Sequence, residues 1–303
     1  MATMVRSNQA DAIEVHNVRK TLEFAKPKLV YPQFGQPDLI LQRKSDQAKW
    51  IRFTKLGIPS STLSDEPTFT AETVTDVTVS AQLEFWGNGL KIVEFLEETS
   101  YLNLPDEYKK LLGQNAGETI NEKVRDVLKA GTGVTYPNSH TSRLQLEAAD
   151  VAALDTFIDA ATTLEAADAP KIGDDYVCII SPYVKSRLLK ETAFREAIRY
   201  QKDSLFTGEL CKIDGVRFVV TSTAPTVSNT GSYSVVSTLD QSILLGEGAY
   251  GIARLMPGDF QVTVTPPGGH GDEYKVKTAM TWKSYLKAVI LNEAYMRRIE
   301  SAR

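Results

Sequence analysis

Cysteine is almost absent from this sequence, and the segments that would mark a membrane or secreted protein are missing as well. Cys178 and Cys211 are its only cysteines, too few for a disulfide scaffold or a four-cysteine zinc site. Because Cys178 lies in the apolar run YVCII, we expect its thiol to be buried and inert. No run of about 18 apolar residues occurs, and the first residues lack the apolar core of a signal peptide. We therefore expect no membrane span and no secretion by that route.

The chain also lacks the positive charge of a general nucleic-acid-binding protein. Its formal net charge is −4 over 303 residues, whereas such a protein should be basic overall. The charge is uneven, because residues 1–52 carry nine Lys/Arg against five Asp/Glu. A solvated terminal segment is the simpler interpretation of this excess, and a basic arm that touches an acidic partner or nucleic acid is the alternative.

Catalytic motifs are missing too. The three histidines, His16, His140 and His270, lie far apart, and the sequence contains no H-E-x-x-H, His/Cys cluster or G-x-S-x-G elbow. Residues 246–251, GEGAYG, match G-x-G-x-x-G, but a Pro-Gly pair soon follows where a dinucleotide site needs a helix. We expect a glycine-rich turn there, and no catalytic residue, cofactor or metal in the chain.

What the sequence does contain is a very regular alternation in residues 69–85, FTAETVTDVTVSAQLEF. Odd positions are largely apolar and even positions mostly polar, with Val74 as the exception. Period two is typical of a strand with one apolar face, and this strand would extend roughly 55 Å at about 3.3 Å per residue. Residues 48–56 predict a second strand, and the loop-forming GIPSSTLSDEPT between the two predicts one long hairpin.

The other segments predict an α+β fold. The strongest helix is expected at residues 105–130, which begin with Pro105 and are followed by Gly131. YVCII predicts a buried strand, and the Asp-Gly pair at 214–215 predicts a tight hairpin. GNGLKIVEFLEETS, with Gly87 and Gly89 as breaks, predicts the start of a short helix after the hairpin. Its Glu94, Glu97 and Glu98 are interpreted as a solvated face rather than as catalytic carboxylates. The mixed order of helices and strands favours α+β over a doubly wound sheet.

Several segments, taken in their order along the chain, carry a family resemblance. They are the hairpin through FTAETVTDVTVSAQLEFWG, then YKKLLGQNAGETINEKVRDVL, YVCIISPYVKSRLL, TGELCKIDGVRFVVTS, SILLGEGAYG, TPPGG and TAMTWKSYLKAVILNEAYMRRIE. Together they resemble the major capsid (coat) proteins of tailed bacteriophages with the Hong Kong 97 fold, in the podovirus-type family of about 300 residues. The resemblance spans residues 48 to about 300, and GELCKIDGVRFVVTS with MTWKSYLKAVILNE is its most specific part.

The resemblance implies how the chain is divided. We expect an N-terminal arm (1–47), an extended hairpin or E-loop (48–85), a peripheral domain (86–149) with a spine helix (105–130), an axial domain (150–265) and a return to the peripheral domain (266–303). No scaffolding domain precedes the arm, so a separate scaffolding protein is expected. Isopeptide cross-linking, known in one branch of the family, is not carried over, because no motif around Lys49 or Lys55 matches it.

The implied function is a structural major capsid protein that assembles through pentamers and hexamers into an icosahedral shell around double-stranded DNA. Such a protein belongs to the virion and is assembled in the host cytoplasm. Its expected partners are further copies of itself, a scaffolding protein, a portal, decoration proteins and DNA bound without sequence specificity, but no membrane. The alternatives are an encapsulin-like compartment shell and an oligomeric enzyme with an undetected site.

A physical argument independent of the family points to the same contacts. A long two-stranded ribbon has too little surface in its own subunit to bury an apolar face, and isolated hairpins are marginally stable in water. Its apolar residues must then meet another chain, and heterologous contacts of this kind close into rings or extend into lattices. We expect these hairpin residues to lie at inter-subunit contacts: Trp50, Ile51, Phe53, Phe69, Val77, Val79 and Leu83.

Overall fold

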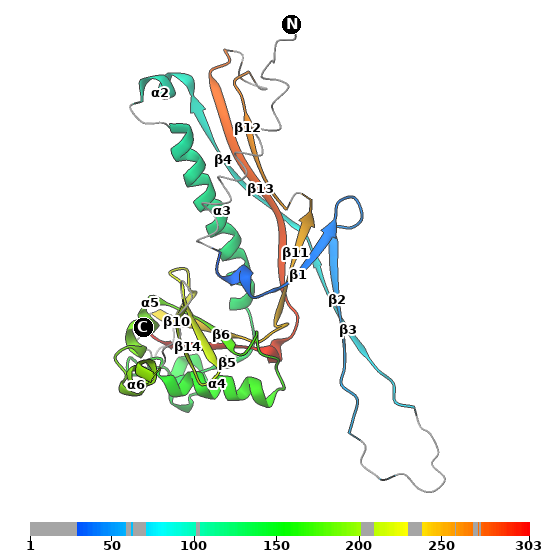
Figure 1. Cartoon of the computed structure of the whole chain (residues 1–303), viewed down its shortest axis with the longest axis vertical. Coiled ribbons are helices and arrows are strands. Elements are labelled where there is room, and N and C mark those ends of the chain that lie inside the picture. The colour runs from blue at the N-terminus through cyan, green and yellow to red at the C-terminus, as the bar shows by residue number, and fades with distance from the viewer. Residues whose placement is uncertain are drawn as a thin grey trace.

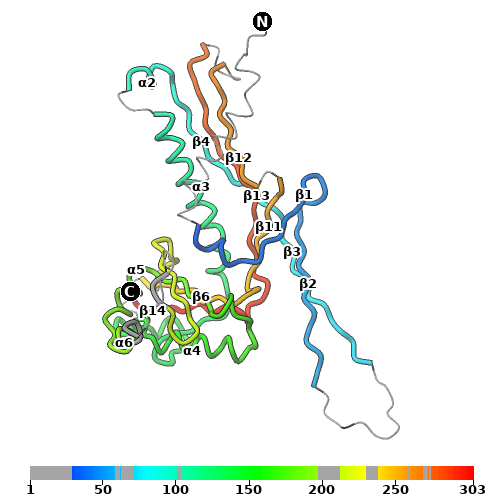
Figure 2. The backbone as a smooth tube through the Cα atoms, in the orientation of Figure 1, coloured from blue at the N-terminus to red at the C-terminus, as the bar shows by residue number. Residues whose placement is uncertain are grey.

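A computed structural model describes residues 29–58, 62, 71–100, 104–200, 209–229, 238–257, 259–268, 272 and 274–303. Two β-sheets with their helices form the body, and a two-stranded hairpin projects from it (Figures 1 and 2). The mixture of helices with parallel and antiparallel strands confirms the predicted α+β class. Within the described ranges, no helix combines the length and the apolar character needed to cross a membrane.

The first sheet has five strands arranged around β13. Its strands are β1 (Gln36–Leu41), β4 (Glu84–Val93), β11 (Tyr250–Met256), β12 (Phe260–Thr265) and β13 (Lys277–Ile290). β1 runs parallel to β11, and the other pairings are antiparallel. Alternate residues of β13, among them Met280 and Trp282, are buried, and helix α3 (Leu104–Lys129) packs against this face through Leu112 and Ala116.

The second sheet has seven strands and is buried on both faces. Its strands are β5 (Val134–Thr135), β6 (Tyr176–Ile180), β7 (Glu209–Ile213), β8 (Val216–Val220), β9 (Thr226–Ser228), β10 (Thr238–Leu245) and β14 (Met296–Ala302). Helices α4 (Leu154–Ala166), α5 (Pro182–Leu188) and α6 (Thr192–Tyr200) cover one face. Every residue of β6 is buried, including Cys178, whose pKa is raised by burial, as expected of an inert thiol.

The C-terminal half of α3 joins the two sheets. Val124 and Leu128 are fully buried in one cluster with Ile243 of the second sheet and Leu286 of the first. One turn earlier, the buried Asn121 accepts hydrogen bonds at Oδ1 from the N–H groups of Val30 and Tyr31, at 2.9 and 3.0 Å. This side chain therefore holds the segment before β1 against the helix.

The remaining elements are short. They are η3 (Tyr31–Gln33), α2 (Glu94–Thr99), η4 (Pro137–Ser139), η5 (Arg143–Gln145), η6 (Glu293–Tyr295) and the two hairpin strands, β2 (Gln47–Phe53) and β3 (Asp76–Gln82).

Several local predictions are confirmed. The long helix spans Leu104–Lys129, and YVCII forms the fully buried β6. Asp214 and Gly215 form a tight turn with positive φ angles of 48° and 73°. GEGAYG provides the turn between β10 and β11 and opens no helix. Residues 1–28, the greater part of the N-terminal arm expected at 1–47, lie outside the described residues.

Two local predictions are corrected. Residues 69–85 are not a single strand of the hairpin, because β3 ends at Gln82 and the chain continues as β4, paired with β13. GNGLKIV lies in β4, paired with β13, rather than starting a helix. Cβ atoms added at Gly87 and Gly89 would lie 2.7 Å from Trp282 O and 2.5 Å from Thr281 Cγ2. These glycines therefore allow close approach to β13.

The two sheets group the strands differently from the segments expected in the sequence. β11 and β12, inside the expected axial segment 150–265, pair within the five-stranded sheet. β14, inside the expected return segment 266–303, pairs with β10 in the seven-stranded sheet.

Candidate inter-subunit surface

Hairpin β2–β3 extends from the body and meets no sheet along its outer part (Figures 1 and 2). Its ladder runs from the pair Gln47 and Gln82 to the pair Phe53 and Asp76, and the N–H of Thr54 adds a further bond to Thr75 O at 3.0 Å. Two antiparallel strands alone bury little surface, so the ribbon has two open faces beyond its base.

The base of one hairpin face is covered by the chain itself. Trp50 lies opposite Val79, and directly opposed residues share a face. The Trp50 ring rests on Gly251 of β11, where an added Cβ would lie 2.7 Å from Trp50 Cζ2. Leu83 and Trp50 also pack against the buried Ile40, Ala48 and Ala253. Two of the predicted contact residues therefore attach the hairpin to its own body.

The other predicted contact residues are more open. Ile51 is 60% exposed and Phe53 69% exposed, both on the face opposite to Trp50. Val77 is 38% exposed and Val79 is half-buried. Phe69 lies outside the described residues. The structure thus leaves Ile51, Phe53 and Val77 as the accessible apolar members of the predicted set.

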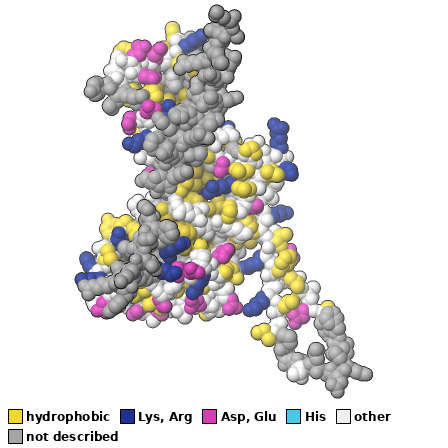
Figure 3. Space-filling model, in the orientation of Figure 1, with side chains coloured by type: hydrophobic (Ala, Val, Ile, Leu, Met, Phe, Trp, Pro, Cys, Tyr) yellow, Lys and Arg dark blue, Asp and Glu magenta, His cyan; other side chains and the backbone are white. Residues whose placement is uncertain are grey.

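Charged side chains lie between these apolar residues, as Figure 3 shows along the hairpin. Lys49 and Arg52 are exposed on β2, and Lys55 follows it. The Lys55 ammonium lies 3.3 Å from the Asp168 carboxylate, but both side chains are more than 80% exposed, so this pair contributes little.

The sequence interpretation missed two further exposed apolar sites. Leu39 and Leu41 are 53% and 51% exposed on β1, whose outer edge is unpaired within the described residues. Phe95 and Leu96 are 75% and 50% exposed on α2. The motifs DLILQ and VEFLEE contain these residues, but periodicity alone does not tell an exposed apolar residue from a buried one.

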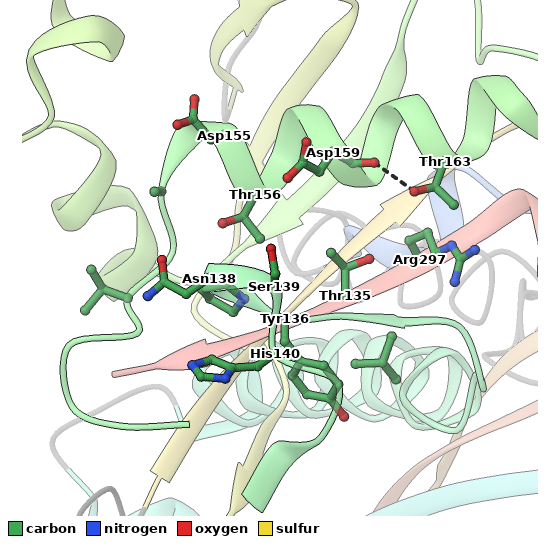
Figure 4. A pocket seen from close by; sticks show the side chains of 14 residues that line it. Thr135, Tyr136, Asn138, Ser139, His140, Asp155, Thr156, Asp159, Thr163 and Arg297 are labelled. Carbon is green, nitrogen blue, oxygen red and sulfur yellow. Dashed lines mark hydrogen bonds between the residues drawn. The ribbon is translucent and has the colours of Figure 1, made fainter. Parts of the chain in front are cut away.

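A polar cavity of about 500 Å³ lies between β5, η4 and α4 (Figure 4). Asp155, Asp159, His140 and Arg297 are among its lining residues. His140 Nε2 lies 3.1 Å from Asp150 Oδ2, and no hydrogen bond joins His140 to a hydroxyl among the described residues. Nowhere in the described part of the chain do three His, Cys, Asp or Glu side chains gather as metal ligands.

Buried ion pairs beside this cavity hold the segment between β5 and α4 on β14. The Arg143 guanidinium donates to the fully buried Glu300 from Nε at 2.7 Å and from Nη2 at 2.6 Å. Burial raises the pKa of Glu300, but these bonds, one from Gln241 and nearby positive charge outweigh it and lower the pKa below its usual value.

Asp150 has a similar role at the other end of the segment. Its carboxylate accepts bonds from Glu147 N at 2.7 Å and Asn138 Nδ2 at 2.5 Å, and its carbonyl accepts from Ala302 N at 2.8 Å. Burial opposes ionisation, yet these donors and His140 lower the pKa of Asp150. Both carboxylates stabilise the fold, and neither is arranged as a catalytic acid or base.

Comparison with known proteins provides a family and a fold. A family model described as "Phage capsid protein" matches residues 76–299. Among solved structures, the capsid of cyanophage P-SCSP1u superposes with a TM-score of 0.68 at 14% identity, covering 91% of this chain and 88% of that one. The capsid of Ralstonia phage GP4 has a TM-score of 0.68 at 13% identity and covers 91% of both chains.

A third capsid, from cyanophage Pam1, matches with a TM-score of 0.68 at 13% identity and covers 100% of this chain and 95% of that one. At these low identities, the TM-scores establish a shared fold. Among curated proteins, none is significantly similar to this chain.

Proposed function

The chain belongs to the phage capsid protein family and is a structural protein of the virion shell, and from this premise we propose that hairpin β2–β3 joins each subunit to its neighbour in pentamers and hexamers. The match covers residues 76–299, from the second hairpin strand to β14. The proposed assembly is an icosahedral shell that encloses double-stranded DNA.

One observation carries this proposal: beyond its base, one face of the hairpin has its apolar side chains exposed. Ile51 and Phe53 are 60% and 69% exposed on a two-stranded ribbon, where no second layer formed by the described residues lies over them. Exposed apolar side chains grouped on one element are typical of an interaction site. A heterologous contact between copies closes into rings, and rings of five and six together close a shell.

The other parts of the chain receive roles by the same reasoning. We propose that residues 1–47 form the N-terminal arm, the hairpin is the E-loop, and α3 (Leu104–Lys129) is the spine helix. The packing of Val124 and Leu128 between both sheets supports a spine role, since one helix then makes the two sheets a single body. The peripheral domain would centre on the five-stranded sheet and the axial domain on the seven-stranded sheet.

The proposed partners follow from shell assembly. Self-association is the first of them, and a separate scaffolding protein, a portal and decoration proteins complete a virion head. Packaged DNA would be bound without sequence specificity, in keeping with the net charge of −4. An unassembled subunit that exposes Ile51 and Phe53 would need a scaffold or chaperone to stay soluble before assembly.

Family membership also bears on the two alternatives. A phage capsid family match favours a virion shell over an encapsulin-like compartment. It argues against the oligomeric enzyme as well. The charged side chains beside the polar cavity pair with one another, His140 with Asp150 and Arg143 with Glu300, and these pairs stabilise the fold. Purified particles that contain DNA rather than a cargo enzyme would support the proposal.

The test is assembly of purified subunits, followed by negative-stain microscopy and analytical ultracentrifugation. Deletion of residues 58–68 at the hairpin tip should leave a folded subunit by circular dichroism and abolish shells. The paired change Ile51→Ser with Phe53→Ser should do the same, and Ser80→Ala on the same hairpin face serves as its control. A wild-type protein that stayed a sharp monomer with scaffold present would refute the shell function.

A further inference from the structure

Helix α2 (Glu94–Thr99) is unusual because none of its residues is buried by the described chain. Phe95 is 75% exposed and Leu96 50% exposed, and Val93, just before the helix, is 42% exposed. Short helices are not stable alone in water and depend on packing of an apolar face. The exposed apolar side chains of this six-residue helix, Phe95 and Leu96, therefore offer a face to which another surface can dock.

The same helix is strongly acidic. Glu94, Glu97 and Glu98 are exposed, and none of them forms an ion pair with a described residue. The docking surface on α2 is thus apolar at Phe95 and Leu96 with three uncompensated carboxylates around it. A partner that covers it must bring apolar side chains and positive charge together.

One face of hairpin strand β2 has this composition. Lys49, Ile51 and Phe53 are two residues apart and share a face, and Lys55 continues the alternation beyond the strand. Ile51 and Phe53 are 60% and 69% exposed, and with Lys49 they lie on the side away from the Trp50 anchor. Lys55 follows the strand and is also exposed.

Little within the subunit competes for these lysines. Lys49 has no acidic partner among the described residues, and the exposed pair of Lys55 with Asp168 is weak enough to be exchanged. Asp76, opposite Phe53, is the one acid on this part of the face. The strip therefore presents two apolar side chains between two positive charges.

We infer that α2 of one subunit receives this strip of a neighbouring copy's hairpin, an inference that rests on the proposed shell function. Ile51 and Phe53 pack on Phe95 and Leu96, while Lys49 and Lys55 face the glutamates of α2. Helix α2 lies at the upper left of the molecule and strand β2 on the right, well apart from it, so the two surfaces meet only between copies (Figures 1 and 2). Such a contact is heterologous and propagates around a ring.

Charge reversal on each side tests the pairing. The variants are Lys49→Glu with Lys55→Glu on the hairpin and Glu97→Lys with Glu98→Lys on α2. Each double change places like charges across the contact, and we expect it to lower shell yield by about tenfold or more. Combining all four changes restores opposite charges, and we expect a yield within about threefold of wild type.

A matched control and a folding check accompany these variants. Glu147→Lys with Glu247→Lys reverses two exposed carboxylates elsewhere and should leave the yield at the wild-type level. Circular dichroism of unassembled subunits should be unchanged in every variant, because α2 contains no buried residue and the lysines are exposed.

A cross-linking measurement works even where a variant assembles poorly. Shells formed from a mixture of Ile51→Cys and Phe95→Cys chains should yield disulfide-linked dimers on mild oxidation, whereas shells of either variant alone should not. Both chains carry Cys211→Ser, and the native Cys178 is fully buried, so neither native cysteine competes.

Rescue by the combined variant, or dimers confined to the mixture, supports the pairing. The pairing would be overturned, with the shell function left standing, by any of three results obtained when the wild-type protein forms shells. These are single-side variants that assemble normally, a combined variant whose yield is not rescued, and a mixture that yields no dimers. Failure of the wild-type protein to form shells under any condition would overturn the shell function and the pairing with it.

Discussion

Replacing Gly251 by alanine should weaken the attachment of the hairpin to the body. The added methyl would lie 2.7 Å from Trp50 Cζ2 and 2.8 Å from Cε2. Carbon atoms in good contact are about 3.5–4.0 Å apart, so one side must move by about 1 Å. Gly251 is held by β1 on one edge and β13 on the other, and therefore the Trp50 ring and the hairpin base must shift.

The expected magnitude combines two opposing terms. Overpacking a well-filled site costs about 1–3 kcal/mol. Replacing a glycine within a strand by alanine returns about 0.5–1 kcal/mol, because the unfolded chain loses freedom. The free energy of unfolding of Gly251→Ala should thus fall by about 1 kcal/mol, within a range of about 0–2.5 kcal/mol. A hairpin shifted at its base should also form shells less efficiently.

A double-mutant cycle with Trp50→Leu isolates the contact. In the Trp50→Leu background the ring is gone, so Gly251→Ala should become neutral or slightly stabilising, a coupling energy of about 1–3 kcal/mol. Urea unfolding of unassembled subunits, followed by circular dichroism, measures all four proteins. Equal effects of Gly251→Ala in both backgrounds would refute the reasoning, because the ring would then not rest on this glycine.

Three further predictions concern the body. Asn121→Ala leaves the buried N–H of Tyr31 and the partly buried N–H of Val30 without their acceptor and should lower stability by about 2–3 kcal/mol in urea unfolding. Asn121→Asp, which keeps an acceptor, should be less affected. Arg143→Ala leaves Glu300 buried without its main partner and should cost about 3 kcal/mol, a loss that Arg143→Lys only partly recovers. Folding lowers the pKa values of Asp150 and Glu300, so the stabilisation by these two carboxylates is complete above their pKa values in the unfolded chain. It is lost as the pH falls through their pKa values in the folded protein. Thermal unfolding between about pH 6 and pH 2 should show this loss of stability, and Asp150→Asn should make the loss smaller.

Local patterns in the sequence were sufficient for many elements. The helix at Leu104–Lys129 was predictable because its proline, glycine and apolar stripe act within a few residues. The turn at Asp214 and Gly215 was predictable for the same reason, since positive φ angles favour this pair. The hairpin was predictable from alternation and a loop-forming tip, although its tip lies largely outside the described residues.

Partners distant in sequence were not predictable. Period two continued through Leu83, but nothing local showed that the strand changes sheets there to pair with β13, almost two hundred residues later. Gly87 and Gly89 suggested the end of the strand, because glycines often interrupt regular elements. The reason for Gly87, the close approach of Trp282 O, lies in the distant strand β13 and is not visible in the local sequence.

The sequence by itself determined that this chain has an amphipathic hairpin, a long helix and the order of segments typical of a phage capsid protein. Only the tertiary structure decided which apolar residues of the hairpin remain available for assembly. Trp50 and Leu83 are covered by β11 and its neighbours, whereas Ile51 and Phe53 stay open on the opposite face. The physical reason is that alternation specifies two faces of a strand, while burial depends on what the rest of the chain brings to each face.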